Sequence, residues 1–253
     1  MRRVFTTGVL AGCALAGFAL PASAALYLGN GATGFGGPVG TGSVSITDTS
    51  TSMTITFNRG AGALNDDLVL YLDTQPGGYI DTSAFTDNGD GGREAISGAN
   101  NGNPSRTIAS FPAGFGADYA ISIENSFIGV FDLSNPANFN YLFGQGQSGN
   151  NSDASYSITM TAAQMAQIGL VAGSGQTFFF DGSLISESAY RSNETIGTSV
   201  TVPGDGSGNA AYSNPQVFTQ DLPYTLVPEP GTLGLGLAAW ITLLIGRRRP
   251  SHK

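Results

Sequence analysis

The feature that most constrains the fold of this chain is an alternation of apolar and polar residues with a period of two. In residues 43–48, for example, Val44 and Ile46 share one face while Ser45 and Thr47 share the other. The same pattern recurs in residues 53–58, 119–124 and 155–160. Because successive side chains of a strand point to opposite faces, these segments are predicted to be half-buried strands. Three further stretches are apolar on both faces, as interior strands are: residues 68–73, 127–133 and 178–180.

Long loops rich in Gly, Asn, Asp and Ser separate these strands, in residues 87–103, 144–153 and 203–214. One short helix is predicted, because Thr161 and Gln164 have the spacing of a capping box and Gly169 can end the helix. The sequence therefore predicts an all-β chain folded as an antiparallel β-sandwich, of the jelly-roll or DOMON-like kind, with long loops and one short helix.

The N-terminal end has the pattern of a secretory signal peptide. A basic start precedes an apolar stretch in residues 4–20, and Ala22 and Ala24 then supply the small side chains that signal peptidase needs. Residues 1–24 are therefore predicted to be removed, which leaves Ala25 as the mature N-terminus.

Two other interpretations of this end remain open. Residues 10–13 look like a lipobox, in which Cys13 would become the lipidated first residue, although only a short apolar run precedes it. Arg2 and Arg3, followed by Val4 and Phe5, resemble part of a twin-arginine signal, but without its usual polar lead-in.

The C-terminal end combines a Pro-Glu-Pro triplet, an apolar run in residues 232–245 and a basic stop. The prolines keep the chain extended, the apolar run favours the bilayer, and the arginines resist translocation. This order places an extended site at the outer membrane face. The residues that make up the pattern are Val227, Pro228, Glu229, Pro230, Arg247, Arg248 and Arg249.

Residues 227–253, with a transmembrane helix in 231–246, resemble the PEP-CTERM sorting signal of Gram-negative bacteria. The resemblance implies processing by an exosortase, a membrane-embedded enzyme. It also implies export to the cell envelope, cell surface or extracellular matrix, with transient anchoring in the inner membrane. The alternative is a permanent anchor. However, residues 232–245 would span only about 21 Å of a hydrocarbon core roughly 30 Å thick.

The domain that remains, residues 25–226, excludes several kinds of chemistry. It keeps four arginines and seventeen carboxylates, a net charge of about −13, which disfavours nucleic acid as a partner and limits membrane contact to the C-terminal segment. It contains no His, Cys, Lys or Trp. Sites built on imidazole, thiolate or amine are therefore excluded, and carboxylate chemistry remains.

A second resemblance covers residues 66–197. The segments D-D-L-V-L-Y-L-D-T-Q-P-G-G from Asp66 and A-D-Y-A-I-S-I-E from Ala117, with residues 156–180 and 181–193, look like the strand order of DOMON-like and family 9 carbohydrate-binding modules. The resemblance implies a sandwich that binds sugars or haem. The chain departs from it in lacking, within the predicted mature domain, the tryptophans that usually stack on glycans and a histidine for haem.

The loop that begins at Thr86 concentrates oxygen ligands of the kind that calcium prefers. The candidate ligands are Asp87, Asn88, Asp90 and Glu94, with no EF-hand spacing. Asp-Asn-Gly sequences are also ordinary turn formers, so a plain turn is the competing interpretation.

Sugar-binding and hydrolytic sites are the remaining candidates. The tyrosines that fall in or beside predicted strands could stack on sugars or pack in the core: Tyr71, Tyr79, Tyr119, Tyr141 and Tyr190. A glycosidase would need two acids from a set that nothing in the sequence pairs: Glu124, Asp132, Glu187 and Glu194.

Taken together, these patterns predict an exported, non-enzymatic surface or matrix protein that accompanies exopolysaccharide and biofilm, a setting that the PEP-CTERM resemblance implies. The alternatives are a carbohydrate-binding module and, less well supported, a glycoside hydrolase. Extracellular polysaccharide is the expected partner besides the exosortase. No cofactor is predicted, calcium at the Asp87 loop apart.

Overall fold

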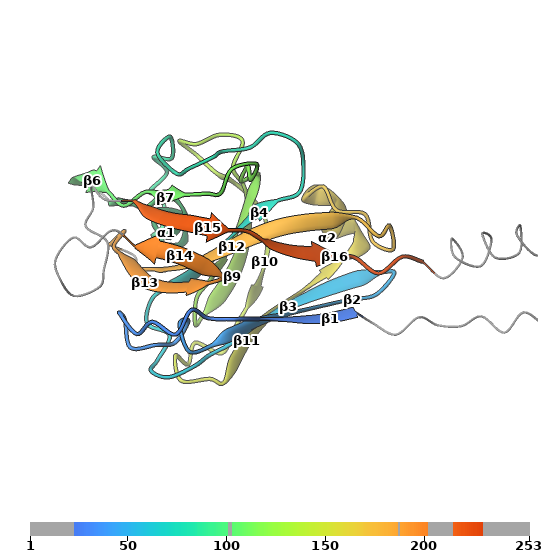
Figure 1. Ribbon diagram of the computed structural model, residues 1–253, viewed down its shortest axis with the longest axis horizontal. Coiled ribbons are helices and arrows are strands. Elements are labelled where there is room, and N and C mark those ends of the chain that lie inside the picture. Colours follow the sequence, from blue (N-terminus) through green and yellow to red (C-terminus); the bar gives the residue numbers. More distant parts are fainter. Residues whose placement is uncertain (1–22, 101–102, 187, 202–214, 230–253) are drawn as a thin grey trace, which may run out of the picture. The chain divides into compact units, whose positions relative to one another are not determined.

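A computed structural model of the chain describes residues 23–229 except 101–102, 187 and 202–214 (Figure 1). A compact unit spans Ala22–Pro228. It consists mainly of antiparallel sheets packed together, consistent with a β-sandwich, which confirms the predicted all-β class. No helix in the described ranges is long and apolar enough to cross a membrane. The predicted transmembrane segment 231–246 and residues Arg247, Arg248 and Arg249 lie outside the described residues.

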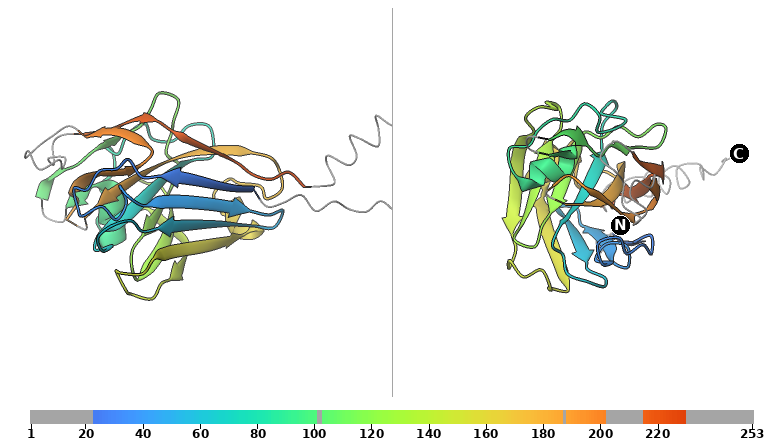
Figure 2. Two further views of the ribbon diagram at one scale, coloured as in Figure 1. Left: turned by 60° about the horizontal axis from the view of Figure 1, so that its bottom comes forward. Right: turned by 90° about the vertical axis from the view of Figure 1, so that its left-hand side faces the viewer.

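The smaller sheet has four strands in the order β1-β2-β3-β11, and Figure 2 shows them side by side. Their bounds are Ser23–Leu28 (β1), Ser43–Asp48 (β2), Ser52–Asn58 (β3) and Ser155–Thr161 (β11). The predicted alternation is confirmed in β2, β3 and β11, where every second residue is buried and its neighbours are partly or fully exposed. One face of this sheet therefore meets the core and the other meets solvent.

The larger sheet has the order β10-β9-β8-β4-β12-β13, and β16 also pairs with β12. Its strands are β4 (Asp67–Asp73), β8 (Tyr119–Ile123), β9 (Phe127–Asp132), β10 (Asn140–Gly146), β12 (Thr177–Ile185), β13 (Arg191–Ile196) and β16 (Leu222–Thr225). The central strands β4 and β8 are buried on both faces. That outcome confirms the interior strand predicted at residues 68–73.

The core between the two sheets is apolar. Ile46, Ile55 and Phe57 from the smaller sheet pack in one cluster with Leu70 and Phe180 from the larger sheet. The period-two pattern assigns Ile46, Ile55 and Phe57 to one face of their strands, and Leu70 and Phe180 come from the stretches predicted to be interior, so the sequence pattern and the packing agree.

A second buried layer covers the other face of the larger sheet. It includes Val69, Tyr71, Ala120, Phe131 and Ile185 from the sheet. Irregular segments cover it, together with a three-stranded sheet in which β15 (Gln216–Gln220) pairs antiparallel with β14 (Thr198–Thr201) and parallel with β7 (Ala109–Ser110). Two short strands, β5 (Ala99–Asn100) and β6 (Asn103–Arg106), form a separate pair. This cover buries both faces of β8, where the sequence predicts a strand buried on one face only.

Among the described residues there are two short helices, where the sequence predicts one in this domain. The helix α2 (Ala162–Gln167) has the expected capping box between Thr161 and Gln164. The other helix, α1 (Gly91–Ser97), lies where the sequence predicts a loop. Asp90 caps it, because its side chain accepts a hydrogen bond from the Arg93 amide, and Gly98 ends it in the left-handed conformation.

Candidate functional site

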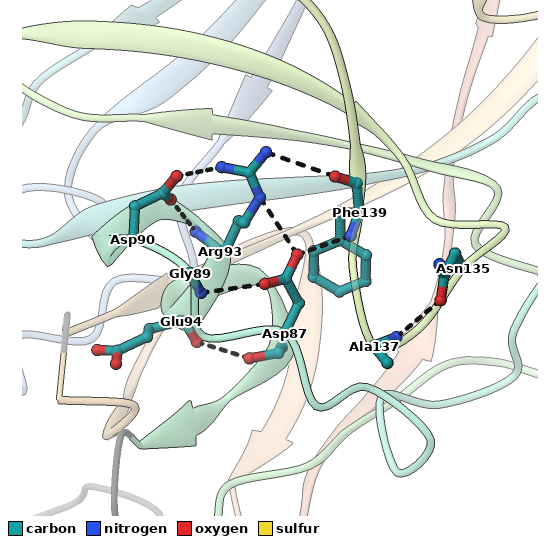
Figure 3. A network of polar contacts seen from close by, with 9 residues as sticks. Asp87, Gly89, Asp90, Arg93, Glu94, Asn135, Ala137 and Phe139 are labelled. Carbon is teal, nitrogen blue, oxygen red and sulfur yellow. Dashed lines mark hydrogen bonds and ion pairs between the residues drawn. The ribbon is translucent and has the colours of Figure 1, made fainter.

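An arginine-centred network occupies the loop for which calcium is considered (Figure 3). Arg93 contacts two carboxylates, pairing with Asp87 through Nε at 3.2 Å and with Asp90 through one terminal nitrogen. Its other terminal nitrogen donates to the Phe139 carbonyl at 3.4 Å. All three guanidinium nitrogens are therefore engaged by this loop and the segment before β10.

Asp87 is nearly buried within the same network. Its Oδ2 accepts the Phe139 amide at 2.6 Å, and its Oδ1 accepts the Gly89 amide at 3.0 Å. Glu94 lies in the first turn of α1, two positions after the glycine pair that opens it. The loop is thus closed by amides and one arginine, which is the arrangement of a turn that leads into a capped helix.

This geometry bears on the calcium prediction directly. The Arg93 guanidinium lies against the carboxylates of Asp87 and Asp90, where a cation would have to lie, and it supplies the positive charge itself. Within the described ranges, no three acidic, His or Cys side chains form a group that could hold a metal ion. The contacts favour the turn interpretation for Asp87, Asn88, Asp90 and Glu94.

Beside this network lies a cavity of about 270 Å³, which we call the aromatic cavity. Its lining residues come from α1 and its cap, from β8 and the residue after it, from β9 and from β10: Asp90, Gly91, Gly92, Arg93, Ser122, Glu124, Phe127, Gly129, Phe131 and Tyr141. The cavity brings together three residues that the sequence singles out for different reasons. Asp90 is a calcium candidate, Glu124 a hydrolytic candidate and Tyr141 a sugar-stacking candidate.

Aromatic rings form one wall of the aromatic cavity. The Tyr141 ring lies 5.7 Å from the Phe131 ring, edge to face, and 6.3 Å from the Phe127 ring. Phe127 and Tyr141 are 37% and 45% exposed, and they are the two aromatic residues among the exposed large hydrophobic residues of the described chain. Arg93 stacks over Phe131 at 5.0 Å, so the charged network and the aromatic wall are in contact.

Glycines make room for these rings. A Cβ at Gly129 would lie 2.8 Å from the Phe131 ring, and one at Gly144 would collide with the Phe127 ring. Gly129 is on β9 and Gly144 on β10, so the side chains that would fill this face of the two strands are missing. The rings therefore lie directly over these glycines and occupy the space that side chains there would fill.

A second, more polar cavity of about 390 Å³ lies at the end of the larger sheet where β4 ends and β8 begins. Asp118 and Asp132 line it together with Tyr79 and Tyr119. The Asp118 carboxylate accepts the Thr74 and Gln75 amides at 3.1 and 2.9 Å. Burial raises the pKa of Asp118; these two amides oppose the rise, and the nearby Asp132 charge adds to it.

The tyrosines considered for sugar stacking differ in their exposure to solvent. Tyr71 is fully buried and hydrogen-bonded to Arg191, so it packs in the outer layer. Tyr119 is 9% exposed, and its hydroxyl accepts a hydrogen bond from Gln75 at 2.8 Å. Tyr79 and Tyr190 are half-buried, which leaves Tyr141 as the tyrosine of this set that presents its ring to solvent.

The acids considered for hydrolysis are not brought together. Glu124 lines the aromatic cavity and Asp132 lines the second cavity. Glu194 is fully buried against four backbone amides, of Phe35, Gly37, Val39 and Gly40. Glu187 lies outside the described residues.

Sequence reasoning missed Phe127, Phe131 and Arg93 as parts of one site. A signal for the first two was present, since Phe127, Gly129 and Phe131 alternate and therefore share one face of β9. The arginine's role depends on Phe139, 46 residues away in the chain, and no local pattern reports that contact.

The described parts of the two targeting patterns lie at the ends of the compact unit. Ala24 and Ala25 are in β1, which begins at Ser23, whereas Ala22 lies outside the described residues. Val227 and Pro228 are half-buried and Glu229 is exposed, and Pro230 lies outside the described residues. The Val227 amide donates to the buried Asp48 carboxylate at 2.8 Å, so the folded unit holds the chain up to the start of the Pro-Glu-Pro triplet.

No protein-family model matches this chain, and comparisons with curated proteins and with solved structures find no match either. Any assignment of function therefore depends on the residues and their geometry.

Proposed function

We propose that this chain is an exported, non-enzymatic protein of the cell surface or extracellular matrix, processed at its C-terminus by an exosortase and associated with exopolysaccharide. In this proposal residues 1–24 are a signal peptide and residues 25–226 form a sandwich of the jelly-roll or DOMON-like kind. Residues 227–253 are the sorting signal, which anchors the chain transiently in the inner membrane.

The observation that carries the proposal is where the compact unit begins and ends. It spans Ala22–Pro228, so the C-terminal pattern begins at its limit, whereas the predicted cleavage between Ala24 and Ala25 falls in β1. A processing site at the end of a folded unit is accessible to an enzyme, whereas a strand of the core is not. The C-terminal boundary therefore supports tail processing.

Two hydrogen bonds near the C-terminal end of the folded unit support the same conclusion. Tyr224 donates its hydroxyl to Asp48 at 2.6 Å, and the Val227 amide donates to the other oxygen of that carboxylate. Glu229, two residues further, is exposed. Glu229, in the middle of the Pro-Glu-Pro triplet, is therefore accessible at the surface, and prolines keep such a segment extended.

Mass spectrometry of the secreted and membrane-bound protein tests the proposal. In cells with an active exosortase, the chain should begin at Ala25 and end near residues 228–230. Glu229→Ala should leave a full-length, membrane-bound chain, while Glu94→Ala should be processed normally because that carboxylate lies within the folded unit. A wild-type chain that still ends at Lys253 in these cells would contradict the proposal.

Neutral replacements of Arg247, Arg248 and Arg249 test the orientation of the tail. They should weaken membrane retention because the positive charges hold the segment on the cytoplasmic side. Lys253→Ala is the matched control, since it removes one charge and leaves the arginine cluster intact. Equal retention of the arginine variant and the control would contradict this part of the proposal.

A carbohydrate-binding module is a second candidate, and the aromatic cavity is the observation that favours it. A glycoside hydrolase has less support, because Glu124 and Asp132 line different cavities and Glu194 is held by loop amides.

A further inference from the structure

We propose that the aromatic cavity binds a single ring of a neutral polysaccharide, stacked on Tyr141 and Phe127. The inference names a ligand class and a site for the proposed role in the exopolysaccharide layer, and it rests on that role for its biological setting. Binding itself is a property of the folded unit. It can therefore be measured whether or not the tail is processed.

The stacking surface is built into the strands. The Tyr141 ring contacts Phe131 and Phe127, with ring centres 5.7 and 6.3 Å apart, and Arg93 stacks over Phe131. Phe127 and Tyr141 nevertheless keep 37% and 45% of their surface in solvent. A sugar ring offers one face of C–H groups, which the negative face of an aromatic ring attracts.

The space available to a ligand is the cavity volume itself, because glycine positions in its lining are already covered. A Cβ at Gly129 would lie 2.8 Å from the Phe131 ring, and one at Gly92 would lie 3.1 Å from a Glu124 carboxylate oxygen. Ser122, also in the lining, donates its hydroxyl to Asp67 at 3.3 Å. At about 270 Å³, the cavity is smaller than the roughly 300–1,000 Å³ of pockets that hold drug-sized ligands, so one sugar ring fits better than several.

The charges around the cavity select a neutral ligand. Asp90 and Glu124 contribute two negative charges and Arg93 contributes one positive charge, so the lining is net negative. The guanidinium is already held by Asp87, Asp90 and the Phe139 carbonyl, which leaves it poorly placed to pair with a uronate or sulfate. The carboxylates can accept hydrogen bonds from sugar hydroxyls, whereas an acidic sugar would meet repulsion.

The second cavity is a weaker candidate for the same ligand. Its tyrosines are less accessible, because Tyr119 is 9% exposed and bonded to Gln75, and Tyr79 packs edge to face on Phe85 at 4.8 Å. It therefore offers polar groups without an open stacking surface, and it provides an internal control.

Affinity electrophoresis of the full-length chain in a sugar-free detergent tests the inference. Neutral glucans and mannans immobilised in the gel should retard the protein, whereas alginate and polygalacturonate should not. Tyr141→Ala and Phe127→Ala should each raise the dissociation constant obtained from the retardation about tenfold, because each removes one ring of the stacking surface. Tyr141→Phe should retain most of the binding, since the ring remains.

Two control variants separate this site from general effects. Val171→Ala removes an exposed apolar side chain elsewhere, and Tyr79→Ala removes a tyrosine from the second cavity; both should bind as the wild type does. Circular dichroism melting confirms that every variant is folded. The inference is overturned by absence of binding to every neutral polysaccharide, by a preference for the acidic ones, or by binding that survives both Tyr141→Ala and Phe127→Ala. A failure of tail processing would leave all of these results unaffected.

Discussion

Two fully buried carboxylates in this molecule have opposite surroundings. Glu194, on β13, accepts four backbone amides: those of Phe35 and Gly37 at 2.7 and 3.0 Å, and those of Val39 and Gly40, both at 3.0 Å. Asp181, on β12, has no hydrogen-bond partner for either oxygen among the described residues. Neither forms an ion pair in the described chain. Burial alone therefore does not define the state of a carboxylate, since the donors around it decide.

The difference has a direct physical consequence. Four amide dipoles directed at the Glu194 oxygens stabilise its negative charge and fasten the glycine-rich segment of residues 34–40 to the sheet. At Asp181, burial raises the pKa to about 9, with a smaller contribution from the nearby Asp221 charge. Asp181 is therefore protonated at neutral pH, whereas the four amides that donate to Glu194 connect the 34–40 segment to the sheet.

The largest effect is expected for Glu194→Gln. The amide group of glutamine keeps one acceptor oxygen but turns an NH2 group toward two of the four backbone donors. Each buried donor left without an acceptor costs about 1–3 kcal/mol, so the free energy of unfolding should fall by about 2–6 kcal/mol. Chemical denaturation monitored by circular dichroism measures this change.

Glu94→Gln is the matched control for that substitution. Glu94 is half-buried on α1 rather than held by a set of amides, so the same chemical change there should stay within about 0.5 kcal/mol. Equal losses in the two variants would show that the four amides do not stabilise the fold.

Asp181 should make the stability of the wild-type protein depend on pH. Its folded pKa lies above that of an unfolded aspartate, so the folded state holds an extra proton between about pH 4 and pH 9. Its stabilising contribution is fully present below about pH 4. It is lost as the pH rises towards 9, at about 1.4 kcal/mol per pH unit.

Asp181→Asn removes that titration and keeps nearly the same shape. The variant should gain stability relative to the wild type as the pH increases from 5 to 8, measured by denaturation at each pH. Asp221→Asn is the comparison, because it removes the smaller cause of the pKa shift and should change the slope less. Parallel stability curves for the wild type and Asp181→Asn would contradict the assignment.

Asp48 is intermediate between the two extremes, and a smaller effect is expected there. Its carboxylate accepts one hydroxyl, from Tyr224, and one amide, from Val227. Asp48→Asn keeps one acceptor oxygen but turns its NH2 group toward the second donor. It should therefore lower the free energy of unfolding by about 1–3 kcal/mol. Tyr224→Phe leaves one buried Asp48 oxygen without its hydroxyl donor and should cost a similar amount, about 1–3 kcal/mol. Thermal melting of both variants measures these losses, and an unchanged Tm in either variant would contradict the assigned role of the Asp48 carboxylate.

These buried carboxylates mark the limit of what the sequence predicts. The strands that face the inner core are readable because Val44, Ile46 and Phe57 alternate with polar residues, and α2 is readable because Thr161 and Gln164 are three residues apart. Such signals are local. The donors to Glu194 are more than 150 residues away along the chain, so no periodicity reveals them.

The outer layer and the aromatic cavity are unpredictable for the same reason. Arg191 is buried through hydrogen bonds to Ser183, to Tyr71 and to the Thr107 carbonyl, which come from separate parts of the chain. The cavity joins Asp90, Glu124 and Tyr141, each of which has a different local interpretation. Helix α1 differs, because its two ends carry local signals. Asp90 is a typical N-cap and Gly98 a typical helix terminator, but the glycine pair Gly91 and Gly92 between them is typical of a loop.

The smallest change in stability is expected when calcium is added. This test concerns Asp87, a buried carboxylate that is paired with an arginine. The Asp87 carboxylate pairs with Arg93 and accepts hydrogen bonds from two backbone amides, so its charge is already balanced. A calcium site at a hundredfold excess over Kd would add about 2.7 kcal/mol, or a rise of several degrees in Tm for a domain of this size. We expect no rise when calcium replaces a chelator in the wild type. Arg93→Gln removes the cation that balances Asp87 and Asp90, so a rise confined to that variant would show that the arginine holds the place of a metal ion. A rise in the wild type would instead show that the loop binds calcium despite Arg93.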